Sequence, residues 1–167
     1  MPDDTIDALP YRPCVGVLLF NREGDVFVGQ RVDQEIDAWQ MPQGGIHKGE
    51  EPETAALREL EEETGARSVT VLAESREWHA YDLPKDLVKK VWKGKYRGQT
   101  QKWFAMAFTG DESEIDPTAV DHPEFTKWCW ASLDELPRIA VPFKRDVYVA
   151  VAAEFAEVVA RLQGTKK

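Results

Sequence analysis

The residues best suited to chemistry are four glutamates within five consecutive positions, in the stretch RELEEETG at residues 58–65. If this stretch is helical, Glu59, Glu62 and Glu63 fall within roughly one quadrant at about 100° per residue. Glu61 points elsewhere and is expected to be solvated. Three carboxylates that converge on one spot make a hard, oxygen-rich site, which suits Mg²⁺ or Mn²⁺ rather than zinc.

This placement of charge is unfavourable for helix stability alone. Gly65 suits the position just after a helix end, so Glu62 and Glu63 lie in the last turn, where the helix dipole disfavours anions. Glu59 precedes them by three and four positions, and like charges at those spacings cost roughly 0.2–0.5 kcal/mol a pair. A solvated acidic face is the ordinary explanation of such a run. A bound dication would reverse the repulsion, and we favour that explanation.

The loop before these acids, PQGGIHKGEEPE at residues 42–53, has features of a ligand-binding loop. Gly44 and Gly45 allow the backbone to bend tightly or to approach a ligand closely. Pro52 suits the first position of a following helix. Glu50 lies near the end of the loop and could reach the same metal region.

The elements that must position these residues are mixed strands and two main helices. Strands are predicted at residues 14–20, 26–32, 38–41, 69–81, 102–109 and 125–131, helices at 52–64 and 143–162, and a capped turn at 132–136. Leu57 and Leu60 should anchor the first helix to the sheet. Such a mixture indicates a layered α/β or α+β sandwich.

Composition fits one domain with a real core, because the chain has 167 residues and 43% of them are hydrophobic. The net charge of −9 argues against general affinity for duplex DNA, which needs many cations on phosphates. Cys14 and Cys129 lie far apart, which favours a reduced, cytoplasmic setting over a disulfide framework. Residues 1–10 lack the apolar core of a signal peptide, and no apolar run approaches the roughly 18 residues of a membrane helix. We expect a flexible tail at residues 1–10 and one domain at residues 11–162.

Positive charge gathers at one place in this acidic chain. Residues 85–102 contain seven cations and one acid, Asp86. A solvated basic loop and an arm near an anionic substrate explain this equally well. The cations are Lys85, Lys89, Lys90, Lys93, Lys95, Arg97 and Lys102.

Residues 44–66, GGIHKGEEPETAALRELEEETGA, resemble the signature of the Nudix hydrolases. That pattern is Gly, five residues, Glu, seven residues, then Arg-Glu-apolar-any-Glu-Glu-any-Gly-apolar, and it is filled without a gap from Gly44 to Ala66. The resemblance implies an α/β/α sandwich with a mixed central sheet and two main helices. It also implies a loop-helix-loop that binds a divalent metal, with Mg²⁺ preferred over Mn²⁺, and hydrolysis of a nucleoside diphosphate linked to another group.

The resemblance extends over about residues 11–156, through YRPCVGVLLFN, WQMPQGG, GQTQKWF, PEFTKWCW and PFKRDVY. It is nearest to the branch of RNA pyrophosphohydrolases and dinucleoside polyphosphate hydrolases. It implies removal of pyrophosphate from the 5′-triphosphate end of RNA, which promotes mRNA decay, or asymmetric cleavage of diadenosine tetraphosphate. Cys14 and the stretch HAYDLP depart from the RNA enzymes and leave this choice open. A non-catalytic nucleotide-binding module is a third alternative, against which the intact carboxylates speak.

The resemblance also implies roles for single residues. Glu59, Glu62 and Glu63 would hold the metal, with Glu124 added from a loop. Glu62 is the carboxylate that we favour as the acceptor of the water's proton, and Arg58 would pair with it and orient the metal shell. Arg31 and Phe143 would sandwich a base, while Arg12, Lys102 and Lys144 would contact phosphates. The substrate-binding residues that we predict are Arg12, Arg31, Gly44, Gly45, Tyr81, Lys102, Phe143 and Lys144.

Overall fold

The computed structural model of the chain describes residues 6, 8–31, 38–120 and 123–164. For residues 162–164 it describes the backbone alone. Within that part, one mixed sheet has the main strand order β3-β2-β1-β7-β5, with β4 paired to β1, β6 to β7 and β8 to β2. The strands are β1 Tyr11–Phe20, β2 Val26–Arg31, β3 Trp39–Gln40, β4 Gln43–Gly45, β5 Val69–Glu74, β6 His79–Asp82, β7 Gly98–Phe108 and β8 Phe125–Ala131.

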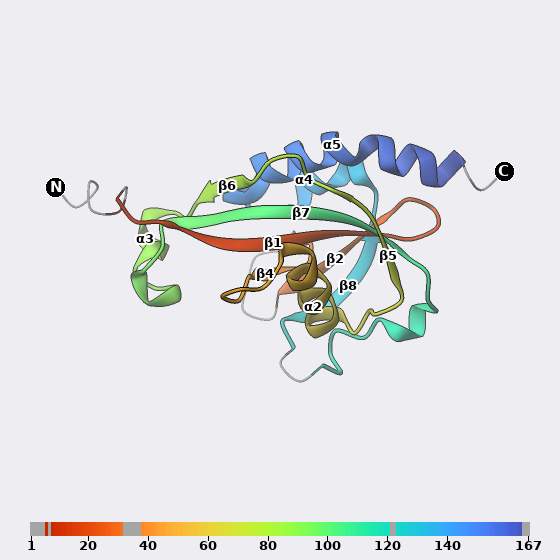
Figure 1. Cartoon of the computed structure of the whole chain (residues 1–167), viewed down its shortest axis with the longest axis horizontal. Coiled ribbons are helices and arrows are strands. Elements are labelled where there is room, and N and C mark those ends of the chain that lie inside the picture. Colours follow the sequence, from red (N-terminus) through yellow and green to blue (C-terminus); the bar gives the residue numbers. More distant parts are fainter. Residues whose placement is uncertain (1–5, 7, 32–37, 121–122, 165–167) are drawn as a thin grey trace.

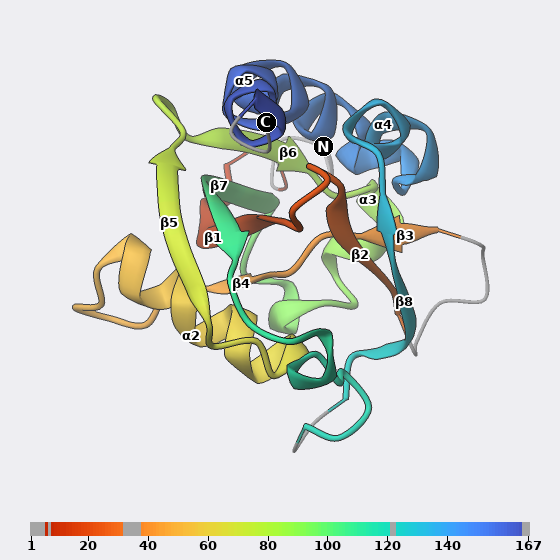
Figure 2. The same cartoon turned by 90° about the vertical axis from the view of Figure 1, so that its right-hand side faces the viewer.

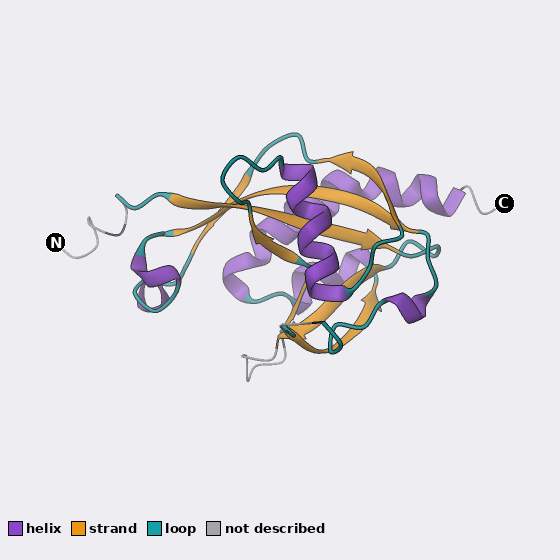
Figure 3. Cartoon of the chain, turned by 60° about the horizontal axis from the view of Figure 1, so that its bottom comes forward, coloured by secondary structure: helices purple, strands orange, loops and turns teal. Residues whose placement is uncertain are grey.

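Helices cover both faces of this sheet. Helix α2 (Pro52–Thr64) lies on one face, and α5 (Arg145–Gly164) with the short α4 (Leu136–Ile139) lies on the other (Figures 1 and 2). Figure 3 brings the α2 side forward and shows this helix crossing the strands. The predicted α/β/α sandwich with a mixed central sheet is confirmed. The remaining helical pieces are α3 Lys85–Val88 and single 3-10 turns at Trp92–Gly94, Glu112–Glu114, Leu133–Glu135 and Pro142–Lys144.

Strand β1 runs through the centre of the molecule. Residues 14–20 are all buried, because both faces of a central strand are covered, and this explains the unbroken apolar run CVGVLLF. The strand pairs in parallel with β7 and antiparallel with β2 and β4. Gly24, with φ 84°, makes the predicted turn into β2. Strand β1 thus joins β7 to β2 and β4 at the centre of the sheet.

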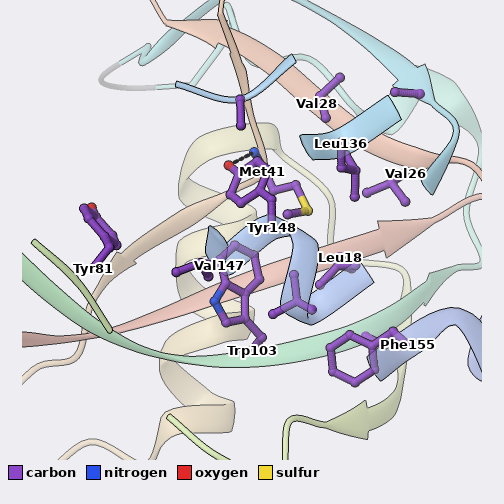
Figure 4. Packing of buried hydrophobic residues seen from close by; sticks show 14 of the residues in the cluster. Leu18, Val26, Val28, Met41, Tyr81, Trp103, Leu136, Val147, Tyr148 and Phe155 are labelled. Carbon is purple, nitrogen blue, oxygen red and sulfur yellow. Dashed lines mark hydrogen bonds between the residues drawn. The ribbon is translucent and has the colours of Figure 1, made fainter. Parts of the chain in front are cut away.

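Two apolar clusters fill the two faces of the sheet. On the α5 side, Trp103 packs edge-on against Tyr148, with ring centroids 5.9 Å apart (Figure 4). The Tyr148 hydroxyl also accepts a hydrogen bond of 2.9 Å from the Met41 N–H. On the α2 side, Leu60 and Phe104 are fully buried. The bond to Met41 ties α5 to the chain that leads into the glycine pair.

Helix α2 has the bounds that the sequence predicted, Pro52–Thr64. Pro52 occupies its first turn, and Gly65 ends it with a left-handed φ of 84°, a conformation that glycine adopts without strain. The Gly65 N–H donates to the Glu61 carbonyl at 2.8 Å. These two local signals fix the register of the acidic residues that follow Arg58.

The predicted anchoring of α2 is partly wrong. Leu60 is fully buried as expected, but 37% of Leu57 is exposed. Ala55 and Ala56 face the sheet in its place, and both are fully buried. Residue 57 follows by about 100° around the helix and is therefore turned toward solvent.

Residues 69–81 form two strands instead of the single predicted strand. Both β5 and β6 pair antiparallel with β7, at separate stretches of it. Between them, Ser75 exchanges backbone and side-chain hydrogen bonds with the backbone of Trp103, at 2.7 and 3.0 Å. This local pairing interrupts the regular ladder. The elements that were not predicted are strand β4, the helical pieces within residues 85–94, the 3-10 turn Glu112–Glu114 and helix α4.

The last helix begins later than predicted, since Pro142–Lys144 forms a 3-10 turn before α5. Part of the predicted tail, Val32 at the end of the second predicted strand, and the side chain of Leu162 lie outside the described residues. In the part of the chain that is described, no helix is long and apolar enough to cross a membrane.

Candidate active site

A cleft of about 510 Å³ lies between β4, the segment that joins β6 to β7, and the 3-10 turn before α5. A second hollow of about 620 Å³ lies on the acidic face of α2, and we call it the acidic hollow. Glu59 and Glu124 line both. The predicted metal ligands and the predicted substrate residues therefore meet at these two carboxylates. The acidic hollow is lined by Arg58, Glu59, Glu61, Glu62, Glu63, Val120 and Glu124.

The structure brings all but one of the predicted substrate residues to the cleft. These are Arg12, Arg31, Gly44, Gly45, Tyr81, Phe143 and Lys144. Lys102 is the exception, because its Nζ lies 3.6 Å from the Glu74 carboxylate, away from the cleft. Side chains alternate along a strand, and Gln99 of the same strand lines the cleft, so Lys102 points to the other face.

Glu63 is the most deeply placed of the acids, with only 2% of its surface exposed. One of its carboxylate oxygens, Oε2, accepts a hydrogen bond of 3.2 Å from the Gln43 N–H. The other, Oε1, is buried and has no partner among the described residues. Burial raises the pKa of the Glu63 carboxyl well above its usual value, and the charges of Glu124 and Glu59 raise it further.

The glycine pair makes room for two functional side chains. A Cβ on Gly44 would lie 2.0 Å from Cδ of Glu59, and a Cβ on Gly45 would lie 2.4 Å from Nη2 of Arg12. Neighbouring residues of a strand face opposite sides, so β4 admits the Glu59 carboxylate on one side and the Arg12 guanidinium on the other. Burial raises the pKa of Glu59 as well, against the opposing effect of Arg58. Any side chain at these two positions would displace them.

Arg58 is the centre of the polar contacts around α2. Its Nε and Nη2 donate to the two oxygens of Glu50 at 2.8 and 2.9 Å, and these bonds lower the pKa of Glu50 to about 2. Its Nη1 donates to Glu59 at 2.9 Å and to Glu62 at 3.2 Å. The predicted pair with Glu62 is therefore present. Nη2 also donates to the Gly45 carbonyl at 2.8 Å.

The structure places Glu50 on Arg58 rather than in the acidic hollow. Both carboxylate oxygens of Glu50 are engaged, and one of them also accepts the His47 N–H at 2.9 Å. We conclude that Glu50 fixes the glycine-containing loop to α2. Glu50 is linked to Glu59 and Glu62 through the Arg58 guanidinium, which contacts all three carboxylates.

Aromatic and cationic side chains form the far wall of the cleft. Tyr81 and Phe143 have ring centroids 5.6 Å apart. The Lys144 ammonium is buried, donates to Gln40 Oε1 at 2.8 Å, and lies 5.8 Å from the Tyr81 ring centre. Arg31 lies 3.9 Å from the Glu124 carboxylate. This wall offers flat surfaces for a base and positive charge for phosphate.

Sequence reasoning missed a buried amide network on the floor of the cleft. Gln99 Oε1 accepts hydrogen bonds from the Tyr81 hydroxyl at 2.9 Å, from Gln101 Nε2 at 3.0 Å and from Gln43 Nε2 at 3.4 Å. The alternation GQTQ in β7 places Gln99 and Gln101 on one face, which was the available signal. The network fixes the Tyr81 ring.

The acidic hollow fits a hard divalent cation by its donor set. Within the described residues, no three acidic, histidine or cysteine side chains are arranged around a single point, and the Arg58 guanidinium contacts Glu59 and Glu62 instead. All the candidate donors are carboxylate oxygens, as Mg²⁺ and Mn²⁺ prefer. The unpartnered Glu63 oxygen and the mutual repulsion of Glu59, Glu63 and Glu124 are what a bound cation would relieve.

Comparisons with known proteins agree with this geometry. The family described as the NUDIX domain matches residues 10–151. A protein of Roseobacter denitrificans, named RNA pyrophosphohydrolase, is 58% identical over 157 residues, which cover 93% of this chain and 98% of that protein. A protein of Azorhizobium caulinodans with the same name is 57% identical over 159 residues, 90% of this chain and 95% of that one.

Solved structures share the fold at lower identity. The E. coli dihydroneopterin triphosphate pyrophosphohydrolase has a TM-score of 0.67 and 20% identity, over 87% of this chain and 99% of that chain. A C. elegans Ap4A hydrolase in a binary complex has a TM-score of 0.63 and 18% identity, over 87% of this chain and 98% of that chain. These structures share the fold, and the family match over residues 10–151 together with the relatives at 57–58% identity shows that the chain belongs to the Nudix family of hydrolases.

Proposed function

We propose that this hydrolase removes pyrophosphate from the 5′-triphosphate end of RNA and so promotes mRNA decay. The observation that carries the proposal is the junction of the cleft and the acidic hollow at Glu59 and Glu124. If the 5′-triphosphate of an RNA crosses this junction, a base of the RNA lies in the cleft and the anhydride bonds lie beside the acids. The two relatives described above carry the name of this activity.

We infer that Glu59, Glu62, Glu63 and Glu124 hold a divalent metal, most simply Mg²⁺. When bound, the metal neutralises phosphate charge and lowers the pKa of a water molecule. Glu62 has 57% of its side chain exposed in the acidic hollow, so it is accessible to take the proton of the attacking water. Arg58 positions the carboxylates.

The residues of the cleft bind and orient the substrate. Arg12 and Lys144 would neutralise negative charge on the phosphates of the substrate. Arg31 and Phe143 enclose a base, for which stacking is favourable whatever the base is, because every base has a π-face. Burial raises the pKa of the Tyr81 hydroxyl above its usual value, so Tyr81 remains neutral and keeps the proton that it donates to Gln99.

A comparison of kcat/KM on two substrates tests the proposed function. A triphosphorylated single-stranded RNA and diadenosine tetraphosphate are compared with one Mg²⁺-loaded preparation. We expect kcat/KM to be at least about tenfold higher on the RNA, a difference of about 1.4 kcal/mol in transition-state binding. Release of pyrophosphate from the RNA is the readout. A higher kcat/KM on diadenosine tetraphosphate would assign the chain to dinucleoside polyphosphates instead.

Glu63→Gln is expected to stabilise the metal-free protein. The folded-state pKa of Glu63 lies above its unfolded value of 4.5, so its contribution to stability is present at low pH and lost as pH rises through the folded pKa. Glutamine keeps an acceptor for the Gln43 N–H and has no charge to bury. In EDTA at pH 8 we expect Tm to rise by at least about 2 °C, which corresponds to roughly 1 kcal/mol at this size.

Mg²⁺ should stabilise the wild type more than it stabilises Glu63→Gln. It should raise the Tm of the wild type, because a ligand that binds only the folded state stabilises it. The rise should be much smaller in Glu63→Gln. Glu61→Gln is the matched control, since Glu61 is exposed and lies 4.0 Å from Arg67; it should respond as the wild type does. A full Mg²⁺-induced rise in Glu63→Gln would place the metal elsewhere.

A further inference from the structure

Residues 85–97, which we call the basic segment, form one wall of the cleft. Their apolar members Leu87, Val91 and Trp92 line it. The segment contains six cations and a single acid, in a chain whose net charge is −9. Four of its lysines are exposed, and among the described residues their side chains have no ion pair. These are Lys89, Lys90, Lys93 and Lys95.

The basic segment is held firmly at its base. Leu83 N–H donates to the Arg97 carbonyl at 2.8 Å, and Arg97 N–H donates to the Pro10 carbonyl at 3.0 Å. The Arg97 guanidinium also pairs with Asp82 at 2.8 Å. In Figure 1 the segment, with α3, lies below the ends of β1 and β7, on the same side of the sheet as α2. The basic segment is therefore fixed beside the cleft that its apolar residues line.

The tip of the basic segment is joined to the cleft through Trp92. Trp92 and Lys93 have left-handed φ values of 48° and 59°, which residues other than glycine seldom adopt unless the surroundings impose them. The Arg12 guanidinium lies 5.2 Å from the Trp92 ring centre. The segment is thus fixed relative to a cation of the cleft that we assign to phosphate.

We propose that the basic segment binds the RNA chain downstream of the 5′ end that the cleft holds. This inference rests on the proposed function. A nucleoside triphosphate ends within the cleft, whereas an RNA continues past it with one negative charge per nucleotide. The remainder of this acidic protein repels that chain, and the four exposed lysines offset the repulsion without reading sequence. The segment therefore favours long single-stranded RNA over short substrates.

Counterion release gives the expected size of the effect. For single strands, the logarithm of the binding constant falls with the logarithm of salt concentration by about 0.7 for each neutralised phosphate. Four lysines give a slope of about 2.8, which corresponds to a loss of up to about 50-fold in binding between 50 and 200 mM salt. A triphosphorylated dinucleotide has no phosphates beyond the cleft for these lysines to neutralise, so its binding should depend less steeply on salt.

A pair of charge-matched variants tests the proposal. One combines Lys89→Gln, Lys90→Gln, Lys93→Gln and Lys95→Gln. The control removes the same charge from exposed arginines outside the cleft and the acidic hollow, and combines Arg22→Gln, Arg67→Gln, Arg138→Gln and Arg161→Gln. Values of kcat and KM are measured at 50 and 200 mM KCl on a triphosphorylated dinucleotide and on a triphosphorylated single-stranded decamer.

We expect the lysine variant to lose at least about tenfold in kcat/KM on the decamer at 50 mM salt, mainly through KM, and to lose most of the salt dependence. Its activity on the dinucleotide should stay within about threefold, which also reports that it is folded. The arginine variant should retain the preference for the decamer. Equal losses on both lengths, equal losses in both variants, or a wild type without any preference for length would overturn the proposal. Failure of the wild type on both RNAs would overturn the proposed function itself.

Discussion

Replacing Glu62 by glutamine should lower kcat/KM by at least about a hundredfold in saturating Mg²⁺, the scale typical of a lost electrostatic contribution at a reacting centre. The substitution keeps the shape of the side chain and removes one negative charge from the acidic hollow. Because most of the Glu62 side chain is exposed and its neighbours are anionic, folding should be unaffected or slightly favoured. The measurement is turnover of triphosphorylated RNA, together with Tm to confirm the fold.

Glu61→Gln is the control for this substitution. Glu61 also borders the acidic hollow, but its carboxylate lies beside Arg67 at 4.0 Å rather than beside Arg58. We expect its kcat/KM to stay within about twofold of the wild type, because exposed ion pairs contribute little. Turnover of Glu62→Gln near the wild-type rate would remove Glu62 from the assignment, and an equal loss in Glu61→Gln would mean that bulk charge matters rather than a ligand.

Phe143→Ala should lose activity selectively on substrates that carry a base beyond the 5′ end. Stacking is worth about 1–3 kcal/mol per base, which is roughly a 5- to 150-fold loss of kcat/KM at 1.36 kcal/mol per tenfold. The full loss is expected on a triphosphorylated dinucleotide. A lone nucleoside triphosphate has no second base to stack. The kcat/KM of Phe143→Ala on it should therefore be close to that of the wild type.

Val158→Ala separates stacking from packing, because Val158 is partly buried against the same apolar cluster as Phe143. The Val158→Ala variant should have a lower Tm than the wild type, and its kcat/KM should change by the same factor on the two substrates. Phe143 also contacts Tyr81, so a modest drop in Tm is expected for Phe143→Ala as well. Equal losses of Phe143→Ala on the dinucleotide and the mononucleotide would mean that Phe143 only supports the wall of the cleft.

Local signals predicted some elements well. Helix α2 begins at Pro52 and ends before Gly65 as expected, since both residues restrict the backbone by themselves. Strand β8 also has its predicted bounds, Phe125–Ala131. Because the bounds of α2 were predicted correctly, the positions of the Nudix-signature acids along this helix were predicted correctly as well. What these elements have in common is that the residues which define them are close together in the sequence.

Features that depend on distant partners were predicted poorly. The break at Ser75 comes from hydrogen bonds to Trp103, and no neighbouring residue announces it. Leu57 turned toward solvent because the placement of α2 on the sheet favours its alanines. Lys102 lies away from the cleft because the pairing of β7 sets which side chains face it. Each of these depends on register or packing, which a single sequence does not contain.

Arg58 has a consequence for how the enzyme passes between its metal-free and metal-loaded forms. Without metal, its guanidinium already supplies the positive charge that Glu59 and Glu62 need. A dication that binds at the proposed site would compete with this internal counterion for the two carboxylates. The two bonds to Glu50 can keep Arg58 in place when the other two carboxylates are released. If the proposed metal binds at Glu59 and Glu62, its loading is an exchange of one cation for another on these two carboxylates.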